Sequence, residues 1–288
     1  MGTKGVNRVI ITAMHSELFS LFGLNIQAYG LLMAVGFMAC YFMARRLARL
    51  TGRDVNEPDT LIMIAAVCGV IGARAVYVWQ NWAAEFAEHP LAMFQVWRGG
   101  LVFYGGFVLA AVGMVAYALL RGEPLRRLTD FCVVFVPLGH AFGRLGCFFH
   151  GCCFGGLCPV EGVGVRFPKG SPAWMHQLAQ GKIAQRAAES LPVWPTQLIE
   201  AAGCAVLFVA LWWLYRTQRA RAGLCSGIYC VGYALLRFLG ECLRDDPRGA
   251  TYWKMSFSQT ISVGLLMVGL AFVASAFLLR STDGTIDR

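Results

Sequence analysis

The stretch FSQTISVGLLMVGLAFVASAFLL, residues 257–279, decides the fold class. It contains no Lys, Arg, Asp or Glu. A helix of about 20 mostly apolar residues crosses the hydrocarbon core of a bilayer, where every backbone polar group has to be paired within the protein. The stretch therefore predicts a transmembrane helix.

Six further apolar blocks precede this stretch along the chain. They lie near 24–44, 59–79, 101–120, 129–149, 194–215 and 223–243. The first block starts too late and is too long for a cleaved signal peptide, so we expect it to remain as a helix. Of the 288 residues, 57% are hydrophobic and only 14% are charged, whereas soluble domains carry about 25% charged residues. We expect an all-α polytopic membrane protein with seven transmembrane helices, in which residues 1–288 form a single membrane domain.

Positive charges lie in alternate loops between the blocks. The loops after the first, third and fifth blocks carry Arg45, Arg46, Arg49, Arg53, Arg121, Arg126, Arg127, Arg216, Arg219 and Arg221. The loop 80–100 has only Arg98 as a cation, and the loop after the sixth block mixes Arg244, Arg248 and Lys254 with Asp245 and Asp246. Lys and Arg accumulate on the cytoplasmic side of membranes. The N-terminus is therefore expected outside and the C-terminus in the cytoplasm, with residues 150–193 as a small extracytoplasmic head.

The net charge of +9 comes from Lys and Arg residues that cluster between apolar blocks, as in polytopic membrane proteins, so nucleic acid is rejected as the partner. Six charged residues instead fall within the apolar blocks or near their ends. They are Arg74, Asp130, Arg144, Glu200, Arg237 and Glu241. A charge at membrane depth indicates function, or an ion pair that locks helix packing. Guanidinium groups bind phosphate well and keep their charge when buried, so the three arginines indicate an anionic substrate, and phospholipid is the plentiful anion in a membrane.

The segment GHAFGRLGCFFHGCCFGG, residues 139–156, ends the fourth block. Its glycines permit either a tight helix crossing or the close approach of a lipid headgroup. It also contains Cys147, Cys152 and Cys153, with Cys158 shortly after and His150 between them. This spacing matches no common zinc pattern, and adjacent cysteines rarely bind one metal together. Disulfides are therefore the favoured interpretation, because the segment is expected to face an oxidising space.

Six motifs follow one another in chain order. They are Tyr29-Gly30-Leu31-Leu32, Gly72-Ala73-Arg74-Ala75-Val76-Tyr77, Phe103-Tyr104-Gly105-Gly106, Gly143-Arg144-Leu145-Gly146, Pro195-Thr196-Gln197-Leu198-Ile199-Glu200, and Gly232-Tyr233-Ala234-Leu235-Leu236-Arg237 with Glu241 and Arg244. From about Gln27 to Gly269 the chain thus resembles the bacterial phosphatidylglycerol–prolipoprotein diacylglyceryl transferases. Each motif is weak by itself, but six in this order are specific.

The resemblance implies transfer of the diacylglyceryl group of phosphatidylglycerol to the lipobox cysteine of a preprolipoprotein, with release of glycerol 1-phosphate. It implies a site toward the outer leaflet of the bacterial inner membrane, phosphatidylglycerol and preprolipoprotein signal peptides as partners, and no metal or soluble cofactor. The expected catalytic residues are Arg144, Arg237 and Tyr104. The expected substrate-binding residues are Tyr29, Arg74, Gly143, Gly146, Cys147, His150, Gly155, Gln197, Glu200 and Glu241.

Three positions depart from the family pattern. Tyr104 replaces a histidine, Cys147 an asparagine and Cys152 an acidic residue. A phenol is a poor general base at neutral pH, so Tyr104 is expected to donate a hydrogen bond. We hypothesise that His150 or Tyr104 takes over the histidine's task. Two other functions remain open: a paralogue that binds phospholipid without transferring it, and a membrane thiol–disulfide oxidoreductase that uses the cysteines from Cys147 to Cys158.

Overall fold

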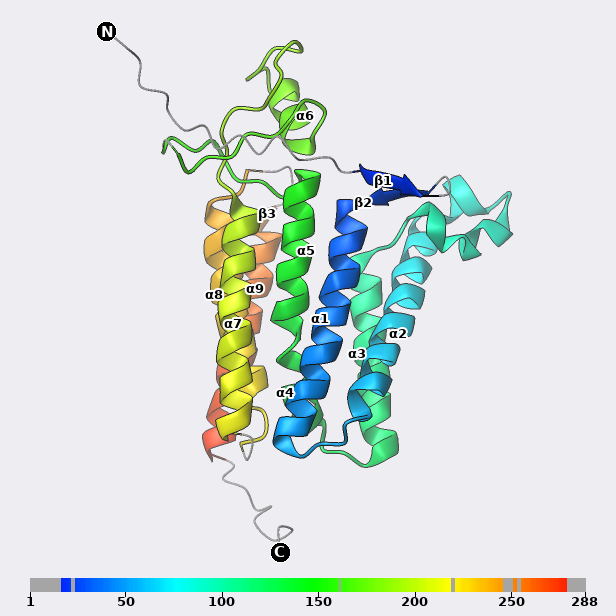
Figure 1. Ribbon diagram of the computed structural model, residues 1–288, viewed down its shortest axis with the longest axis vertical. Helices are drawn as coiled ribbons and strands as arrows, with labels where there is room; N and C mark the ends of the chain where they lie inside the picture. The colour runs from blue at the N-terminus through cyan, green and yellow to red at the C-terminus, as the bar shows by residue number, and fades with distance from the viewer. Residues whose placement is uncertain are drawn as a thin grey trace, which may run out of the picture. The chain divides into compact units, whose positions relative to one another are not determined.

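The computed structural model describes residues 17–21, 24–160, 162–218, 221–245, 251–252 and 255–278. The α-helices of this part are α1 (Ala28–Thr51), α2 (Glu57–Gln80), α3 (Phe103–Arg121), α4 (Leu125–Val133), α5 (Val136–His150), α6 (Pro172–Ala179), α7 (Thr196–Gln218), α8 (Leu224–Cys242) and α9 (Phe257–Leu278) (Figure 1). Single-turn helices η1 (Trp82–Phe86), η2 (Pro90–Phe94) and η3 (Val96–Arg98) connect α2 to α3. Strand β1 (Glu17–Leu21) pairs antiparallel with β2 (Leu24–Gln27), and β3 (Thr251–Tyr252) with β4 (Met255–Ser256).

Six helical segments in the described residues are long and apolar enough to cross a membrane. They are α1, α2, residues 104–121 of α3, α4 with α5, α7 and α9. The expectation of a nearly all-helical polytopic membrane protein is confirmed. The remaining expected span coincides with α8, whose 19 residues include Arg237 and Glu241 and which is not among these six segments. The count of seven and the orientation stay predictions. The expected last residue of the final span, residue 279, and the loop residues Arg219, Asp246, Arg248 and Lys254 lie outside the described part.

Large apolar side chains point outward from these helices. Leu120 on α3 is 87% exposed and Leu278 on α9 is 81% exposed, and many other Leu, Val, Met and Phe side chains are exposed along the same helices. A protein with an exposed apolar surface of this extent would aggregate in water, whereas in a membrane the acyl chains of lipids cover that surface. The outward side chains therefore support the membrane assignment independently of helix length.

The chain forms two compact units, one of residues 41–129 and the other of residues 1–40 with 130–288. The boundaries fall within α1 and within α4. In the smaller unit, α2 packs closely on α3 because Gly72 and Gly105 face each other, and a Cβ at either position would collide with the other residue's carbonyl oxygen. Arg53 pairs there with Glu57 at 2.6 Å and also with Glu123.

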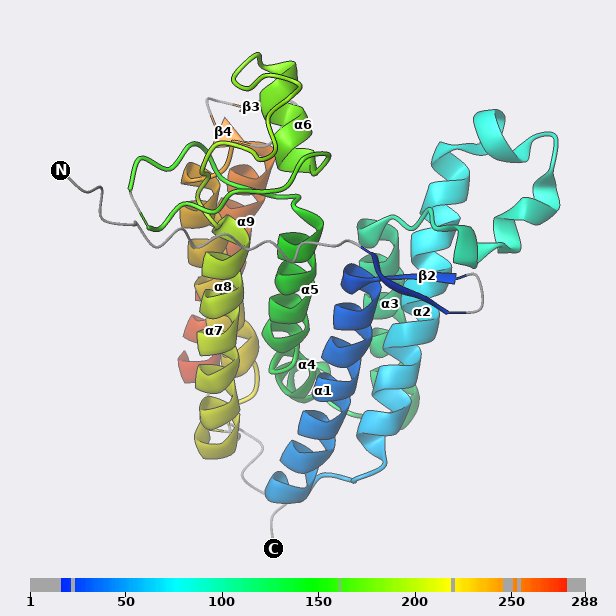
Figure 2. The same cartoon turned by 45° about the horizontal axis from the view of Figure 1, so that its top comes forward.

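In the larger unit, α5, α7, α8 and α9 lie side by side (Figures 1 and 2). Helices α8 and α9 approach closely at Gly227 and Gly269, where an added Cβ would lie 2.8 Å from a backbone nitrogen of the other helix. Asp130 supplies the cap of α8: its Oδ2 accepts from Gly223 N at 2.6 Å and its Oδ1 from Ser226 N at 2.8 Å. A buried carboxylate at a helix N-terminus satisfies otherwise unpaired N–H groups and the helix dipole. Asp130, singled out in the sequence for its depth, therefore has a structural role.

The expected fourth block, 129–149, is not one continuous helix. Helix α4 ends at Val133 and α5 begins at Val136, with Pro137 in its first turn. Pro137 has no N–H to donate to the carbonyl of Val133, four residues earlier, and its ring clashes with that carbonyl. The helix is interrupted there for that reason.

Residues 151–195 join α5 to α7 and form a small apolar core together with the end of α5. It consists of Phe148, Phe154, Val165, Phe167, Ala173 and Val193. Ser171 caps the N-terminus of α6, since its hydroxyl accepts from Trp174 N at 3.3 Å, and Trp174 Nε1 donates to Ala187 O at 3.0 Å. This segment contains most of the expected head, residues 150–193. Its position outside the cytoplasm and the single-domain expectation remain predictions.

Candidate active site

The side chain of Arg144 on α5 forms an ion pair with Glu200 on α7. Arg144 Nη2 lies 2.9 Å from Glu200 Oε1, and both side chains are largely buried. Arg144 Nε donates to Nε2 of His140, one helical turn earlier, at 3.2 Å. This hydrogen bond needs His140 Nε2 without a proton, so the 3.4 Å approach of the same nitrogen to Glu200 is a contact rather than a donated bond. The guanidinium of Arg144 is thus oriented from two sides.

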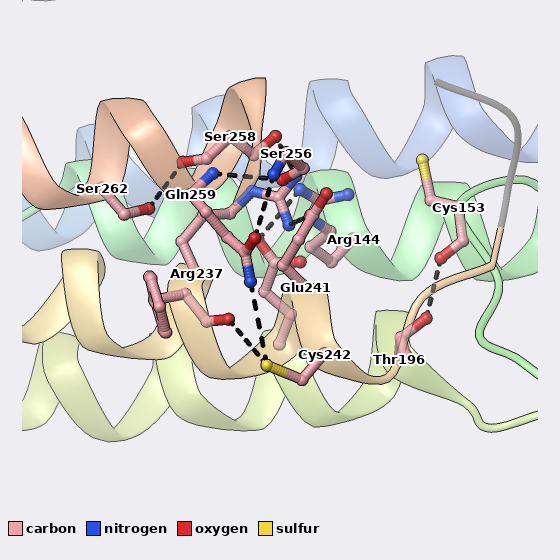
Figure 3. A network of polar contacts seen from close by, with 12 residues as sticks. Arg144, Cys153, Thr196, Arg237, Glu241, Cys242, Ser256, Ser258, Gln259 and Ser262 are labelled. Carbon is pink, nitrogen blue, oxygen red and sulfur yellow. Dashed lines mark hydrogen bonds and ion pairs between the residues drawn. The ribbon is translucent and has the colours of Figure 1, made fainter. Parts of the chain in front are cut away.

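A second ion pair lies within α8. Arg237 Nη1 is 2.9 Å from Glu241 Oε2, four residues later on the helix, and Arg237 Nη2 donates to Ser258 Oγ of α9 at 2.9 Å. Figure 3 shows Arg144, Arg237 and Glu241 gathered in one region. The charges of both Arg144 and Arg237 act on Glu200. Two arginines and two glutamates therefore form a cluster with balanced charge, which we call the arginine cluster.

The arginine cluster lies near one end of each of α5, α7 and α8, and residues 151–195 connect the ends of α5 and α7. Arg144 is six residues before the end of α5, Glu200 four residues after the start of α7, and Arg237 five residues before the end of α8. At 1.5 Å per residue these positions are roughly 6–9 Å from the helix ends. This depth matches the boundary between lipid headgroups and hydrocarbon rather than the middle of a bilayer.

The first half of α1 packs on α5 beside Arg144. A Cβ added at Gly146 would lie 2.8 Å from Cδ2 of Tyr29, so the absence of a side chain there lets the Tyr29 ring rest against α5. Gly143 is less restricted, since its added Cβ would lie 3.7 Å from Met33 Sδ. Tyr29 remains 43% exposed. These three candidate binding residues thus lie on or against the α5 turn that carries Arg144.

Gln197 and Gly155 make contacts that hold the chain after α5 in place. Gln197 Nε2 donates to Cys152 O at 2.7 Å, and the Gln197 side chain is buried. Gly155 N donates to Trp194 O at 3.0 Å, and an added Cβ would lie 2.6 Å from Trp194 Cβ and 2.7 Å from Leu243 O. Both residues therefore have a structural role in this segment. A role in substrate binding stays a prediction for them.

All eleven cysteines lie in the described part of the chain and are free thiols, so the expected disulfides are not present. The Sγ atoms of Cys147, Cys152 and Cys153 all lie within 4.8 Å of one another. The pKa of the Cys153 thiol is lowered because hydrogen bonds from Cys147 and Cys152 favour its thiolate, with a smaller effect from the charges of Arg244 and Arg144. The pKa of Cys152 is raised, chiefly by its hydrogen bond with Cys147.

Arg74, Tyr77 and Gly99 belong to the unit of residues 41–129 and line a pocket of about 530 Å³. Arg74 is buried, and its guanidinium donates to the carbonyl oxygens of Ala92, Met93, Gly99 and Gly100 at 2.7–3.1 Å. The guanidinium of Arg74 thus uses its hydrogen bonds to hold the loop between α2 and α3. A substrate-binding role for Arg74 stays a prediction, and the geometry gives it a structural one.

Tyr104 and His150 are the two candidates for the task of the missing histidine. Tyr104 is 64% exposed at the start of α3, in the unit of residues 41–129. His150 is exposed at the last position of α5, where Gly151 with φ of 76° ends the helix. Within the described residues, His150 makes no hydrogen bond to the arginine cluster. The hypothesis for either residue stays a prediction.

Residues 16–275 match the family profile described as prolipoprotein diacylglyceryl transferase. The chain belongs to this family. It is 31% identical over 275 residues to the phosphatidylglycerol–prolipoprotein diacylglyceryl transferase of Ralstonia pickettii (strain 12J), a match that covers 88% of this chain and 90% of that protein. It is 29% identical over 268 residues to the enzyme of that name from Cupriavidus pinatubonensis (strain JMP 134 / LMG 1197), covering 91% of each chain. The match to the Paraburkholderia phytofirmans (strain DSM 17436 / LMG 22146 / PsJN) enzyme is 31% over 273 residues and covers 88% and 90% of the two chains.

As a diacylglyceryl transferase family member, the chain holds its motif arginines in specific pairs, and two partners were missed in the sequence. His140 lies four residues before Arg144, a spacing that places both on one helix face. That spacing was a usable signal. Ser258, which accepts from Arg237, comes from α9 and had no signal in the sequence, because nothing in the pattern showed which helices are neighbours.

Proposed function

We propose that the protein transfers the diacylglyceryl group of phosphatidylglycerol to the lipobox cysteine thiol of prolipoproteins, releasing glycerol 1-phosphate. The observation that carries the proposal is the arginine cluster, in which Arg144 and Arg237 are held on neighbouring helices within electrostatic reach of one anion, Glu200. Membership of the transferase family over residues 16–275 and relatives that bear this enzyme name support it.

In the proposed step, the thiolate sulfur of the peptide attacks the carbon of the diacylglyceryl group that is bonded to the phosphate oxygen. The S–C bond forms as the C–O bond breaks, and glycerol 1-phosphate leaves with the bonding electrons. The thiol proton passes to solvent or to the departing phosphate. Negative charge builds on phosphate during this step, and preorganised guanidinium groups in a site shielded from water stabilise such charge strongly. Arg144 and Arg237 fill this role.

The carboxylates of Glu200 and Glu241 position the two arginines. A long, flexible side chain loses conformational freedom when it binds substrate, so fixing it in advance lowers that cost. Arg144 forms an ion pair with Glu200 through Nη2 and donates a hydrogen bond to His140 through Nε. Its Nη1 has no hydrogen-bond partner among the described residues. This edge of the guanidinium is the one we assign to the phosphate.

The site faces the outer leaflet of the bacterial inner membrane in this proposal, with seven spans, the N-terminus outside and the C-terminus in the cytoplasm. The support is the charge pattern of the loops and the position of the arginine cluster toward residues 151–195, the segment that the pattern assigns to the outside. The prolipoprotein signal peptide then reaches the cluster from that side.

The test uses purified protein in detergent with phosphatidylglycerol and a synthetic lipobox peptide. It measures glycerol phosphate release and the mass gain on the peptide cysteine. The wild type is expected to turn over, and Arg144→Gln and Arg237→Gln are expected to lose at least about 100-fold. Arg221→Gln, just before the opposite end of α8, is the matched control and is expected to retain turnover.

Two outcomes would contradict the proposal. A folded wild type that binds phosphatidylglycerol without turnover would identify a lipid-binding paralogue. Turnover retained in both arginine variants would remove the arginine cluster from the chemistry. Alanine at both Tyr104 and His150 tests the hypothesis on the missing histidine in the same assay, and unchanged turnover would reject it.

A further inference from the structure

The three sulfur atoms of Cys147, Cys152 and Cys153 form a compact group at the end of α5. Cys147 lies in the last turn of the helix, and the other two follow Gly151, where the helix ends. Each Sγ is within 4.8 Å of the other two, and all three residues are partly buried free thiols. A single ion placed between them can contact all three sulfurs.

Adjacent cysteines in ordinary extended or helical backbone point their side chains apart, which argues against a shared ligand. The backbone here is different, because Cys153 has φ of 60°, the one non-glycine residue with positive φ in the described chain. Such a conformation is costly for a residue with a side chain and persists where the surroundings enforce it. With this backbone, the Cys153 sulfur lies within 4.8 Å of the sulfurs of Cys147 and Cys152.

Two buried side chains at the start of α7 enforce this backbone. Thr196 Oγ1 donates to Cys153 O at 2.8 Å, as Figure 3 shows, and Gln197 Nε2 donates to Cys152 O at 2.7 Å. The amide nitrogen of Cys152 donates back to Cys147 O at 3.2 Å. The peptide carbonyls of both adjacent cysteines are therefore fixed by another helix, so the sulfur geometry is preorganised rather than left to a loop.

The charges around the group suit an anionic metal complex. Arg144 lies three residues before Cys147 on α5 and therefore on the same face, and the charges of Arg144 and Arg244 both act on Cys153. Three thiolates with one monovalent cation carry a net charge of −2, and the positive charges of Arg144, which also pairs with Glu200, and of Arg244 reduce the cost of that charge. A thiol is only a weak hydrogen-bond donor to phosphate, so binding of a lipid phosphate does not require three sulfurs gathered at one point.

We propose that Cys147, Cys152 and Cys153 form a three-thiolate site for a soft monovalent cation, and that Cu(I) is the ion it fits. Thiolates select soft ions such as Cu(I) and Zn(II). Structural zinc sites take four protein ligands, and no fourth His, Cys, Asp or Glu joins these three within the described residues. On binding, each thiol loses its proton to solvent as its S–Cu bond forms, and the copper stays in the +1 state.

The test measures metal binding by the full-length reduced protein in detergent under anaerobic conditions, and it does not depend on transferase turnover. Cu(I) is added against a chromophoric Cu(I) chelator to give stoichiometry and affinity. The wild type is expected to take one Cu(I) per chain. Cys152→Ser and Cys153→Ser are expected to weaken binding by at least about 100-fold, and Thr196→Val by about tenfold through loss of the backbone anchor. Cys158→Ser, in the same segment but outside the group, is the matched control and is expected to bind as the wild type.

X-ray absorption at the copper edge of the wild-type complex gives the number of sulfur ligands without any variant, so a variant that fails to fold does not weaken the test. Three sulfurs are expected. A spectrum with two sulfurs or with nitrogen ligands would overturn the proposal, as would equal binding by Cys153→Ser and wild type. Tighter binding of Zn(II) than of Cu(I), or a disulfide joining two of the three thiols in the purified protein, would also overturn it.

Discussion

Arg144 Nη2 and Glu200 Oε1 lie 2.9 Å apart, and this ion pair joins α5 to α7 across 56 residues of sequence. Both groups are shielded from water, so the charge of each is stabilised mainly by the opposite charge of the other. The same guanidinium is the first candidate for binding the lipid phosphate. A substitution of Arg144 is therefore expected to change both the stability of the protein and its transferase activity, and experiments have to separate the two effects.

A double variant separates them. Glu200→Gln and Arg144→Gln, made singly, each leave one buried charge without its partner and are expected to lower stability by about 3–5 kcal/mol. The double variant removes both charges and is expected to be more stable than either single variant while remaining inactive. Thermal unfolding in detergent and the peptide transfer assay measure the two properties. A double variant no more stable than the singles would show that the pair does not act as a unit.

His140 is expected to act as a positioning residue for Arg144. His140→Leu removes the acceptor of the Arg144 Nε hydrogen bond, and a hydrogen bond to a charged group contributes about 1.5–3 kcal/mol, so kcat is expected to fall by about tenfold or more. His140→Gln keeps an acceptor oxygen and is expected to recover part of the loss. Steady-state kinetics with both variants provide the comparison. Equal activity of the leucine and glutamine variants would argue against this role.

Asp130 is expected to contribute to stability through the cap of α8. Asp130→Ala removes the acceptor for Gly223 N and Ser226 N and is expected to cost about 1–2 kcal/mol. Ser226→Ala removes only the hydroxyl that donates to Asp130 Oδ1 at 2.7 Å and is expected to cost less. Thermal melting of the two variants in the same detergent ranks them. The reverse order would contradict a capping role.

Gly155 and Gly156 form a matched pair for testing close packing. An added Cβ at Gly155 would meet Trp194 Cβ and Leu243 O at 2.6 Å and 2.7 Å, whereas at Gly156 the nearest atom would lie 3.6 Å away. Gly155→Ala is expected to destabilise the protein by about 1–3 kcal/mol through overpacking, and Gly156→Ala by much less. Melting temperatures of the two variants measure the difference. Similar values would mean that the segment adjusts freely at Gly155.

Arg74 is expected to protect the connection between α2 and α3. Arg74→Gln removes most of the donors that now reach four carbonyl oxygens in residues 92–100. Limited proteolysis is expected to cleave residues 82–102 faster in this variant, because unpaired carbonyls favour a more open loop. Arg121→Gln at the end of α3 is the control and is expected to resemble the wild type. An unchanged cleavage rate in Arg74→Gln would show that the carbonyl contacts are dispensable.

The helices could be predicted from the sequence because lipid requires backbone hydrogen bonds to be made within each segment. Six of the seven apolar blocks coincide with helices long and apolar enough to span a membrane. The pairing of Arg237 with Glu241 also follows from their spacing of four residues on one helix. The interruption before α5 had a local signal in Pro137 that the block at 129–149 did not take into account.

What the sequence by itself determined is the membrane class, the helical segments and the family, since these depend on local composition and on motif order. The tertiary structure alone decided the partners: Glu200 for Arg144, the α8 N-terminus for Asp130, and Thr196 and Gln197 for the carbonyls of two adjacent cysteines. These pairs are separated by 43 to 96 residues. Apolar periodicity tells which residues avoid water but carries no information on which distant polar atom satisfies a buried one, and that choice follows only from how the helices pack.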